Sequence, residues 1–264
     1  MKAAISPIEL GAFHLACIRG KYADALVFCD RGLSLDEAGE GGFTALYCAS
    51  VSGHLDIVRL LCERGASLNL RSNDGITALH AASHNGHLDI VLLLCEKGAA
   101  LDLQYKDGAT ALFVASQNGH LDIVRLLCEG GAALDLQCTT GSTALTVASQ
   151  NGNLDIARLL CERGAVLDLQ RKDGATALHT ASENGHLDIV RLLCERGAAL
   201  DLQCTDGATA LYTASYNGHL DIVRLLCERG CNTLLPTDRK PYKIAVKIHG
   251  IDSPIALFLK SYPH

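Results

Sequence analysis

Cysteine and histidine side chains recur along this sequence every 33 residues, and both types can bind metals or take part in catalysis. Five of the histidines stand eight residues before a periodic cysteine. A zinc site needs ligands that converge on one point, whereas a fixed period spreads single ligands along the chain. We therefore interpret these histidines as residues that hydrogen-bond the loop backbone, and we expect no metal site. The periodic residues are Cys29, Cys62, Cys95, Cys128, Cys161, Cys194, Cys227 and His54, His87, His120, His186, His219.

The periodic cysteines are not spaced for disulfides. Stacked helices lie roughly 8–10 Å apart, while a disulfide needs Cα atoms within about 7 Å. We interpret these side chains as small buried apolar residues. Twelve thiols in one chain indicate a reducing compartment, the cytoplasm or nucleus. A redox or metal role would instead involve Cys138, Cys204 or Cys231.

Catalytic motifs are missing from the sequence. It has no nucleophile elbow, P-loop, H-E-x-x-H motif or dinucleotide-binding glycine pattern. Six periodic aspartates are better explained by the dipole at a helix start than by acid–base chemistry. We expect a protein that is not an enzyme and has no cofactor. These aspartates are Asp56, Asp89, Asp122, Asp155, Asp188 and Asp221.

A repeated unit of 33 residues must position all these side chains. It is clearest at 174–206, GATALHTASENGHLDIVRLLCERGAALDLQCTD. A glycine followed by x-T-A-L opens each of six copies, and weaker copies precede and follow them. Such a unit buries both helix faces only when it is stacked on neighbours. The six glycines are Gly42, Gly75, Gly108, Gly141, Gly174 and Gly207.

One unit contains signals for two helices and a tight turn. Thr176 is a good N-cap for a first helix, which Gly185 ends because glycine adopts the left-handed conformation. A second helix starts near Leu187 and stops at Gly197. The Asp-Gly pair that ends at Gly207 is typical of a tight reversal.

The period, this order of elements and the pattern G-x-T-A-L-x-x-A-S-x-N-G-H-L-D-I-V-x-L-L-C-E-x-G-A closely resemble the ankyrin repeat, over roughly residues 9 to 260. The resemblance implies an all-α ankyrin-repeat solenoid, a curved stack with a helix-turn-helix and a β-hairpin loop in each repeat. Where the family usually has Thr-Pro-Leu-His, this chain replaces proline by alanine, which should weaken each helix start only slightly. The alanines are Ala45, Ala78, Ala111, Ala144, Ala177 and Ala210.

We expect one domain over residues 1–264, because a solenoid has one continuous core. The sequence has no apolar run of about 18 residues and no apolar core of a secretory signal. We therefore expect a soluble protein that is not exported. The predicted divisions are a degenerate cap at 9–41, repeats at 42–74, 75–107, 108–140, 141–173, 174–206 and 207–237, and a second cap at 238–264.

Positions that differ between near-identical copies indicate the binding surface. They cluster after the opening glycine, along the first helix and near the hairpin, where six of the twelve aromatic residues fall. In the ankyrin family these places form a concave groove that binds proteins, and aromatic residues are favoured in such contacts. An alternative is drift after tandem duplication, with some aromatics packed between repeats. The predicted partner-binding residues are Phe43, Tyr47, Ile76, His80, His84, Tyr105, Phe113, His179, Tyr212 and Tyr216.

Charge narrows the class of partner. The formal net charge is −6, and residues 237–264 hold five basic and two acidic residues, so the remainder carries −9. An acidic stack disfavours nucleic acid, whose binding depends on Lys and Arg. We expect a protein or peptide partner, no membrane insertion and a monomeric chain.

Two other functions are compatible with the sequence. The stack could be a structural spacer without a specific groove ligand. It could also be a hydroxylase substrate, because ankyrin hairpins are targets of asparaginyl hydroxylases. The residues of this chain resemble those targets only in their position in the hairpin turn. The favoured role of the residue at this hairpin position is a hydrogen bond to its own turn. The equivalent residues here are Asn69, Asp102, Asp135, Asp168 and Asp201.

Overall fold

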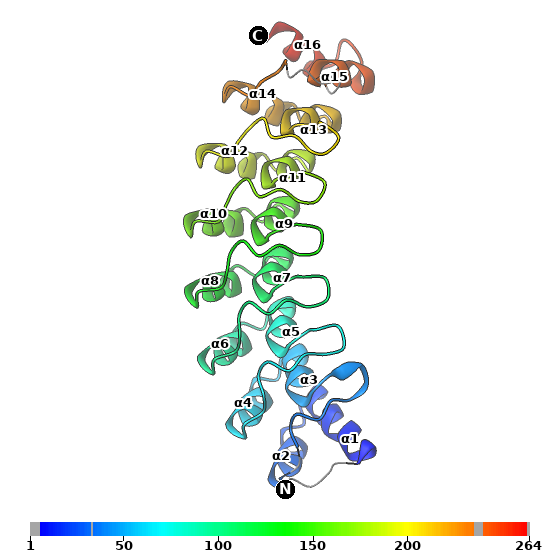
Figure 1. Cartoon of the computed structure of the whole chain (residues 1–264), viewed down its shortest axis with the longest axis vertical. Coiled ribbons are helices and arrows are strands. Elements are labelled where there is room, and N and C mark those ends of the chain that lie inside the picture. Colours follow the sequence, from blue (N-terminus) through cyan, green and yellow to red (C-terminus); the bar gives the residue numbers. More distant parts are fainter. Residues whose placement is uncertain (1–5, 33, 235–239, 263–264) are drawn as a thin grey trace. The chain divides into compact units, whose positions relative to one another are not determined.

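A computed structural model describes residues 6–32, 34–234 and 240–262 of the chain. The chain forms two compact units, Met1–Thr139 (unit 1) and Thr140–His264 (unit 2). Within each unit, successive helix pairs lie one above the next (Figure 1). The described residues contain helices and no strands, so the prediction of an all-helical repeat stack is confirmed.

Each repeat contributes a first and a second helix. Unit 1 contains α1 (Pro7–Ile18), α2 (Tyr22–Asp30), the 3-10 turn η1 (Glu40–Gly42), α3 (Ala45–Ser52), α4 (Leu55–Glu63), α5 (Ala78–Asn85), α6 (Leu88–Glu96), α7 (Ala111–Asn118) and α8 (Leu121–Glu129). Unit 2 contains α9 (Ala144–Asn151), α10 (Leu154–Glu162), α11 (Ala177–Glu183), α12 (Leu187–Glu195), α13 (Ala210–Asn217), α14 (Leu220–Glu228), α15 (Pro241–His249) and α16 (Pro254–Ser261). None of the described helices is both long and apolar enough to cross a lipid bilayer.

The first helices begin and end at the residues that the sequence indicates. The hydroxyl of Thr176 accepts a hydrogen bond from the backbone N–H of His179, as an N-cap should. After the helix, Gly185 has φ +79°, in the left-handed region that favours glycine. The predicted cap and the predicted stop are both confirmed.

Hairpin loops join the repeats, with too few backbone bonds to form strands. In unit 1 the N–H of Tyr105 donates to the carbonyl of Ala109 at 3.2 Å, and the N–H of Gly108 donates back to Tyr105 at 2.7 Å. The next bond crosses between repeats, because Lys106 N–H donates to the carbonyl of Asp74 at 2.7 Å. Neighbouring hairpins are therefore held in register by the backbone.

Stacking buries the same positions in every complete repeat. First helices pack on first helices, as in α3 on α5 and α11 on α13, and second helices pack on second helices. In the repeat of α3 and α4, the side chains of Ala49, Ile57, Val58 and Leu61 are fully buried. Burial of such side chains is the main favourable term in folding.

Candidate functional site

Each periodic histidine ring hydrogen-bonds a backbone carbonyl of the repeat before it. The Nε2 atoms of His87 and His120 hydrogen-bond the carbonyl oxygens of Val51 at 3.3 Å and His84 at 3.0 Å. Unit 2 repeats the contact, with His219 Nε2 3.1 Å from the carbonyl of Glu183. The predicted backbone-bonding role is confirmed, although the partner carbonyl lies at the end of the preceding repeat's first helix.

No metal centre is found in the described part of the chain, where no three His, Cys, Asp or Glu side chains are grouped closely enough to hold an ion. None of the twelve cysteines forms a disulfide. Of the periodic ones, only Cys29 and Cys227 are buried, and the other five are partly exposed. The prediction of buried side chains is therefore wrong for those five. They lie at the edge of the second helix, between its buried face and solvent. Burial still raises the pKa of thiols such as Cys62 and Cys95.

The equivalent Asn and Asp residues also connect repeats. Asn69 Oδ1 accepts from the N–H of Ala100 at 2.9 Å, and Asp201 Oδ1 accepts from the N–H of Asn232 at 2.8 Å. The expected bond within the residue's own turn is therefore replaced by a bond to the backbone 31 residues further along. This side chain has a structural role that the sequence pattern did not reveal.

A cavity of about 310 Å³ opens in unit 1 on the surface of the first helices and the hairpin. It brings together half of the predicted site residues, from two consecutive repeats, and Val114 of a third repeat completes the lining. Sequence reasoning missed four further lining residues, although Val51 and Val114 stand at positions that vary between copies. The lining residues are Tyr47, Val51, Ile76, His80, Ala81, His84, Asn85, Tyr105 and Val114.

Aromatic contacts fix the shape of this cavity. The Phe43 ring stacks on Tyr47 with centroids 4.4 Å apart, and the Tyr105 ring meets the edge of His80 at 5.5 Å. Burial raises the pKa of both Tyr47 and Tyr105, so the phenols stay neutral. The cavity is therefore lined mainly by apolar side chains, together with two neutral phenols.

His80 forms part of the cavity wall and is only 3% exposed. Its Nδ1 lies 2.8 Å from the Thr77 hydroxyl and accepts from the Thr77 backbone N–H at 3.3 Å. Nε2 therefore carries the proton, which it donates to the carbonyl of Leu103 at 2.8 Å. Burial lowers the pKa of His80 to about 4, so the ring is neutral at pH 7.

Five predicted site residues do not line this cavity, and one of them, Phe43, stacks on the lining residue Tyr47. In unit 1, Phe113 is partly buried on α7. In unit 2, Tyr216 is 48% exposed, while Tyr212 is 8% exposed and packs against Ile244 of α15. His179 is 2% exposed and binds Thr176, as His80 binds Thr77.

Comparison with known proteins places these observations in a family. A family model described as ankyrin repeats, in three copies, matches residues 13–105, 97–171 and 164–236. The match covers most of the chain and the same helix pairs and hairpins. No curated protein matches the sequence. On its sequence and its helical stack, this chain belongs to the ankyrin-repeat family.

Proposed function

We propose that this chain binds a protein or peptide partner through the surface formed by its hairpins and first helices, without catalysing a reaction. Ankyrin repeats are in general protein-interaction modules, and the family is generally non-enzymatic. The observation that carries the proposal is the unit 1 cavity, which gathers five of the ten predicted residues. Twelve free thiols favour a reducing compartment for this function.

The cavity is suited to an apolar or aromatic side chain of the partner. Tyr47, Ile76 and Tyr105 are partly exposed and offer apolar area with few rotatable bonds. His84 is exposed at the border and can form a hydrogen bond with the partner backbone. His80 is too deeply buried to contribute more than an edge, so its role here is to support Tyr105.

The proposed contact surface extends beyond the cavity to exposed members of the same positions. In unit 1 Phe43 stacks on the cavity residue Tyr47 and Phe113 is partly exposed on α7, and in unit 2 Tyr216 provides an exposed aromatic ring. Tyr212 and His179 belong to the interior of unit 2, and they support the surface from below. Most of the binding free energy should come from a few aromatic residues.

Affinity capture from a lysate of the source organism tests the proposal. The variant carries Tyr47→Ala and Tyr105→Ala, because these rings form the cavity and truncating them leaves the stacked core intact. The matched control is Leu92→Arg, an exposed position on α6 where Arg59 and Arg125 stand in neighbouring repeats. Circular dichroism verifies that all three proteins are folded.

Loss of a captured protein from the cavity variant alone would support the proposal. Equal capture by all three proteins would contradict it and favour a spacer without a groove ligand. Titration of the purified captured protein should then give a dissociation constant at least about tenfold weaker for the variant, which corresponds to about 1.4 kcal/mol.

A further inference from the structure

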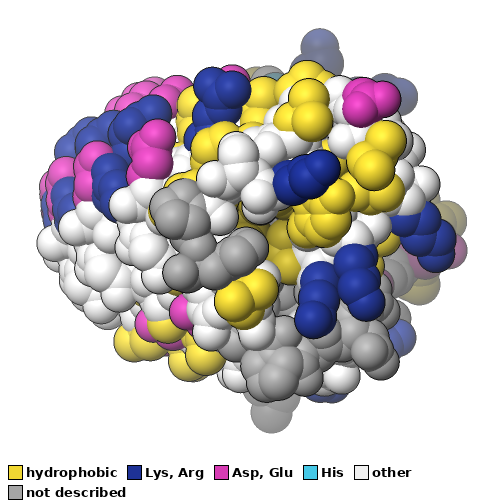
Figure 2. Space-filling view, turned by 90° about the horizontal axis from the view of Figure 1, so that it is seen from above, with side chains coloured by type: hydrophobic (Ala, Val, Ile, Leu, Met, Phe, Trp, Pro, Cys, Tyr) yellow, Lys and Arg dark blue, Asp and Glu magenta, His cyan; other side chains and the backbone are white. Residues whose placement is uncertain are grey.

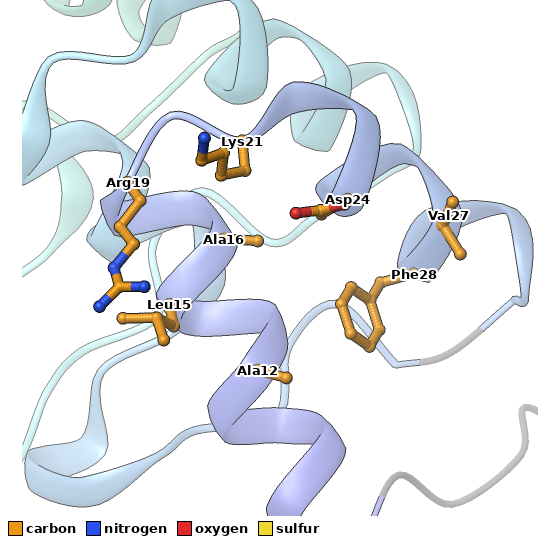
Figure 3. A pocket seen from close by; sticks show the side chains of 8 residues that line it. All are labelled: Ala12, Leu15, Ala16, Arg19, Lys21, Asp24, Val27 and Phe28. Carbon is orange, nitrogen blue, oxygen red and sulfur yellow. The ribbon is translucent and has the colours of Figure 1, made fainter.

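The N-terminal helix pair of unit 1 exposes an apolar face. Leu15 on α1 is 42% exposed and Val27 on α2 is 57% exposed. Between the two helices lies a cavity of about 470 Å³, into which Phe28 and Ala12 also point (Figure 3). Ile18 and Tyr22, each more than two-fifths exposed, extend the apolar surface at the same end.

The same positions are buried in the next two repeats, each of which follows another helix pair. Thirty-three residues after Leu15 and Val27, the side chains of Cys48 and Leu60 are only 5% and 4% exposed. One repeat further on, Ala81 and Leu93 are 5% and 3% exposed. The α1–α2 face is therefore a stacking surface that continues the interface between repeats, and no helix pair among the described residues packs on its outer side.

Charges of both signs surround this face. Arg19, Lys21 and Asp24 line the cavity, and none of them forms an ion pair with the described residues (Figure 3). Asp24 stands where the next repeat has the fully buried Ile57. Two such faces, related by a twofold axis, can therefore bring a cation of each copy beside an anion of the other.

The opposite end of the chain has a different character. Figure 2 shows hydrophobic side chains interspersed with Lys and Arg at the C-terminal end of unit 2. Lys240, Lys243 and Lys260 line the cavity there, and Lys247 is exposed on α15. These four lysines outnumber the exposed Asp252 of the same end, so like charges disfavour self-association there.

We propose that the α1–α2 face binds the same face of a second copy of this chain, forming a twofold-symmetric dimer. Leu15 and Val27 of each copy then lie against helices α1 and α2 of the other, and Lys21 of each copy faces Asp24 of the other. Contact between equivalent surfaces closes the assembly at two copies. The dimer leaves the hairpin surface free, so it is independent of the groove proposal and replaces the expected monomer.

Light scattering coupled to size-exclusion chromatography of the full chain tests this contact. Wild type should approach twice the chain mass of 28.0 kDa as its concentration rises. Leu15→Lys with Val27→Lys should return the mass to that of one chain. The matched control Leu257→Lys, at a 50% exposed position on α16, should keep the dimer.

Charge reversal tests the twofold arrangement. Lys21→Asp alone places like charges together and should weaken the dimer at least about tenfold. Adding Asp24→Lys restores opposite charges and should recover most of the affinity. The variants alter exposed positions, and circular dichroism confirms their fold.

Three results would overturn the dimer. Wild type could stay at one chain mass at every concentration, or the mass could be the same with and without Leu15→Lys and Val27→Lys. Growth beyond two copies would indicate head-to-tail contacts between different ends, contrary to a closed twofold dimer.

Discussion

Units 1 and 2 share one repeat but present different surfaces at a first-helix position that varies between copies. In unit 1 this position holds Tyr47 and His80, beside a cavity. In unit 2 it holds Thr146, which is 1% exposed and bonds the Thr143 hydroxyl at 3.0 Å, and Tyr212, which is in the core. The comparison shows that neighbouring side chains, and not the position alone, decide whether an aromatic ring forms a surface.

The neighbours of the two tyrosines explain their different exposure. Tyr47 is stacked on Phe43, which leaves part of its ring open to the cavity. Tyr212 instead meets Ile244 from α15 and Cys204 from the hairpin, so its ring fills the space between repeats. The alternative that some aromatic residues pack between repeats therefore applies to Tyr212, whereas the ring of Tyr47 stays accessible.

The largest contrast should appear when each tyrosine is truncated. Tyr212→Ala leaves a void in the unit 2 core and should lower the free energy of unfolding by about 4 kcal/mol, against about 2 kcal/mol for Tyr47→Ala. Urea denaturation followed by circular dichroism measures both. Equal losses would show that the two rings are packed alike.

A pH effect should distinguish His80 from Thr146. In the unfolded chain the His80 ring has its ordinary pKa of about 6.5, whereas burial lowers its pKa to about 4 in the folded chain. Protonation of His80 therefore favours unfolding. The contribution of the neutral His80 ring to the free energy of unfolding is complete above pH 6.5. It is lost as the pH falls towards 4, by about 3 kcal/mol in all. His80→Thr, which copies Thr146, should remove the share of His80 from this dependence when unfolding is followed across pH, while His14 and His179, whose pKa values burial also lowers, keep their shares.

A slope that is the same in wild type and in His80→Thr would refute the assignment to the buried ring of His80.

A smaller effect, equal in both units, should come from the glycine after the first helix. A Cβ at Gly86 or Gly185 would lie 2.7 Å from the ring of His120 or His219, at a positive φ. Alanine at either position should cost about 2 kcal/mol. The control Gly98→Ala, with φ +85° and open space around it, should cost only about 1 kcal/mol. Thermal melts of the three variants would expose any difference between the units.

The smallest effect should come from the outer face of the second helices. Leu92 in unit 1 and Arg191 in unit 2 stand at the same position and are both exposed. Exchanging them, as Leu92→Arg and Arg191→Leu, should change stability by less than about 0.5 kcal/mol. A larger loss in either urea titration would mean that the outer faces of the units are not interchangeable.

Local signals account for the parts of the fold that could be predicted. Thr176 caps a helix and Gly185 ends one because each acts on its own backbone within a few residues. Tight reversal at Asp206 and Gly207 follows from the same kind of local preference. Because the unit repeats, helix ends that are correctly predicted in one copy are also correct at the equivalent residues of the other copies.

Contacts between repeats account for what could not be predicted. The acceptors of His87 and the donors to Asn69 lie more than thirty residues away, so no local pattern identifies them. Likewise, Tyr47 and Tyr105 are separated by almost two repeats, and only stacking brings them to one cavity.

The sequence by itself determined the repeat, the helix ends and the family, because period, capping and glycine conformation are properties of neighbouring residues. Only the tertiary structure decided which variable residues are accessible. Tyr212 and His179 are enclosed by helices of other repeats, while Tyr47 borders a cavity. Burial is a property of the packed stack, since it depends on what each repeat places against the next.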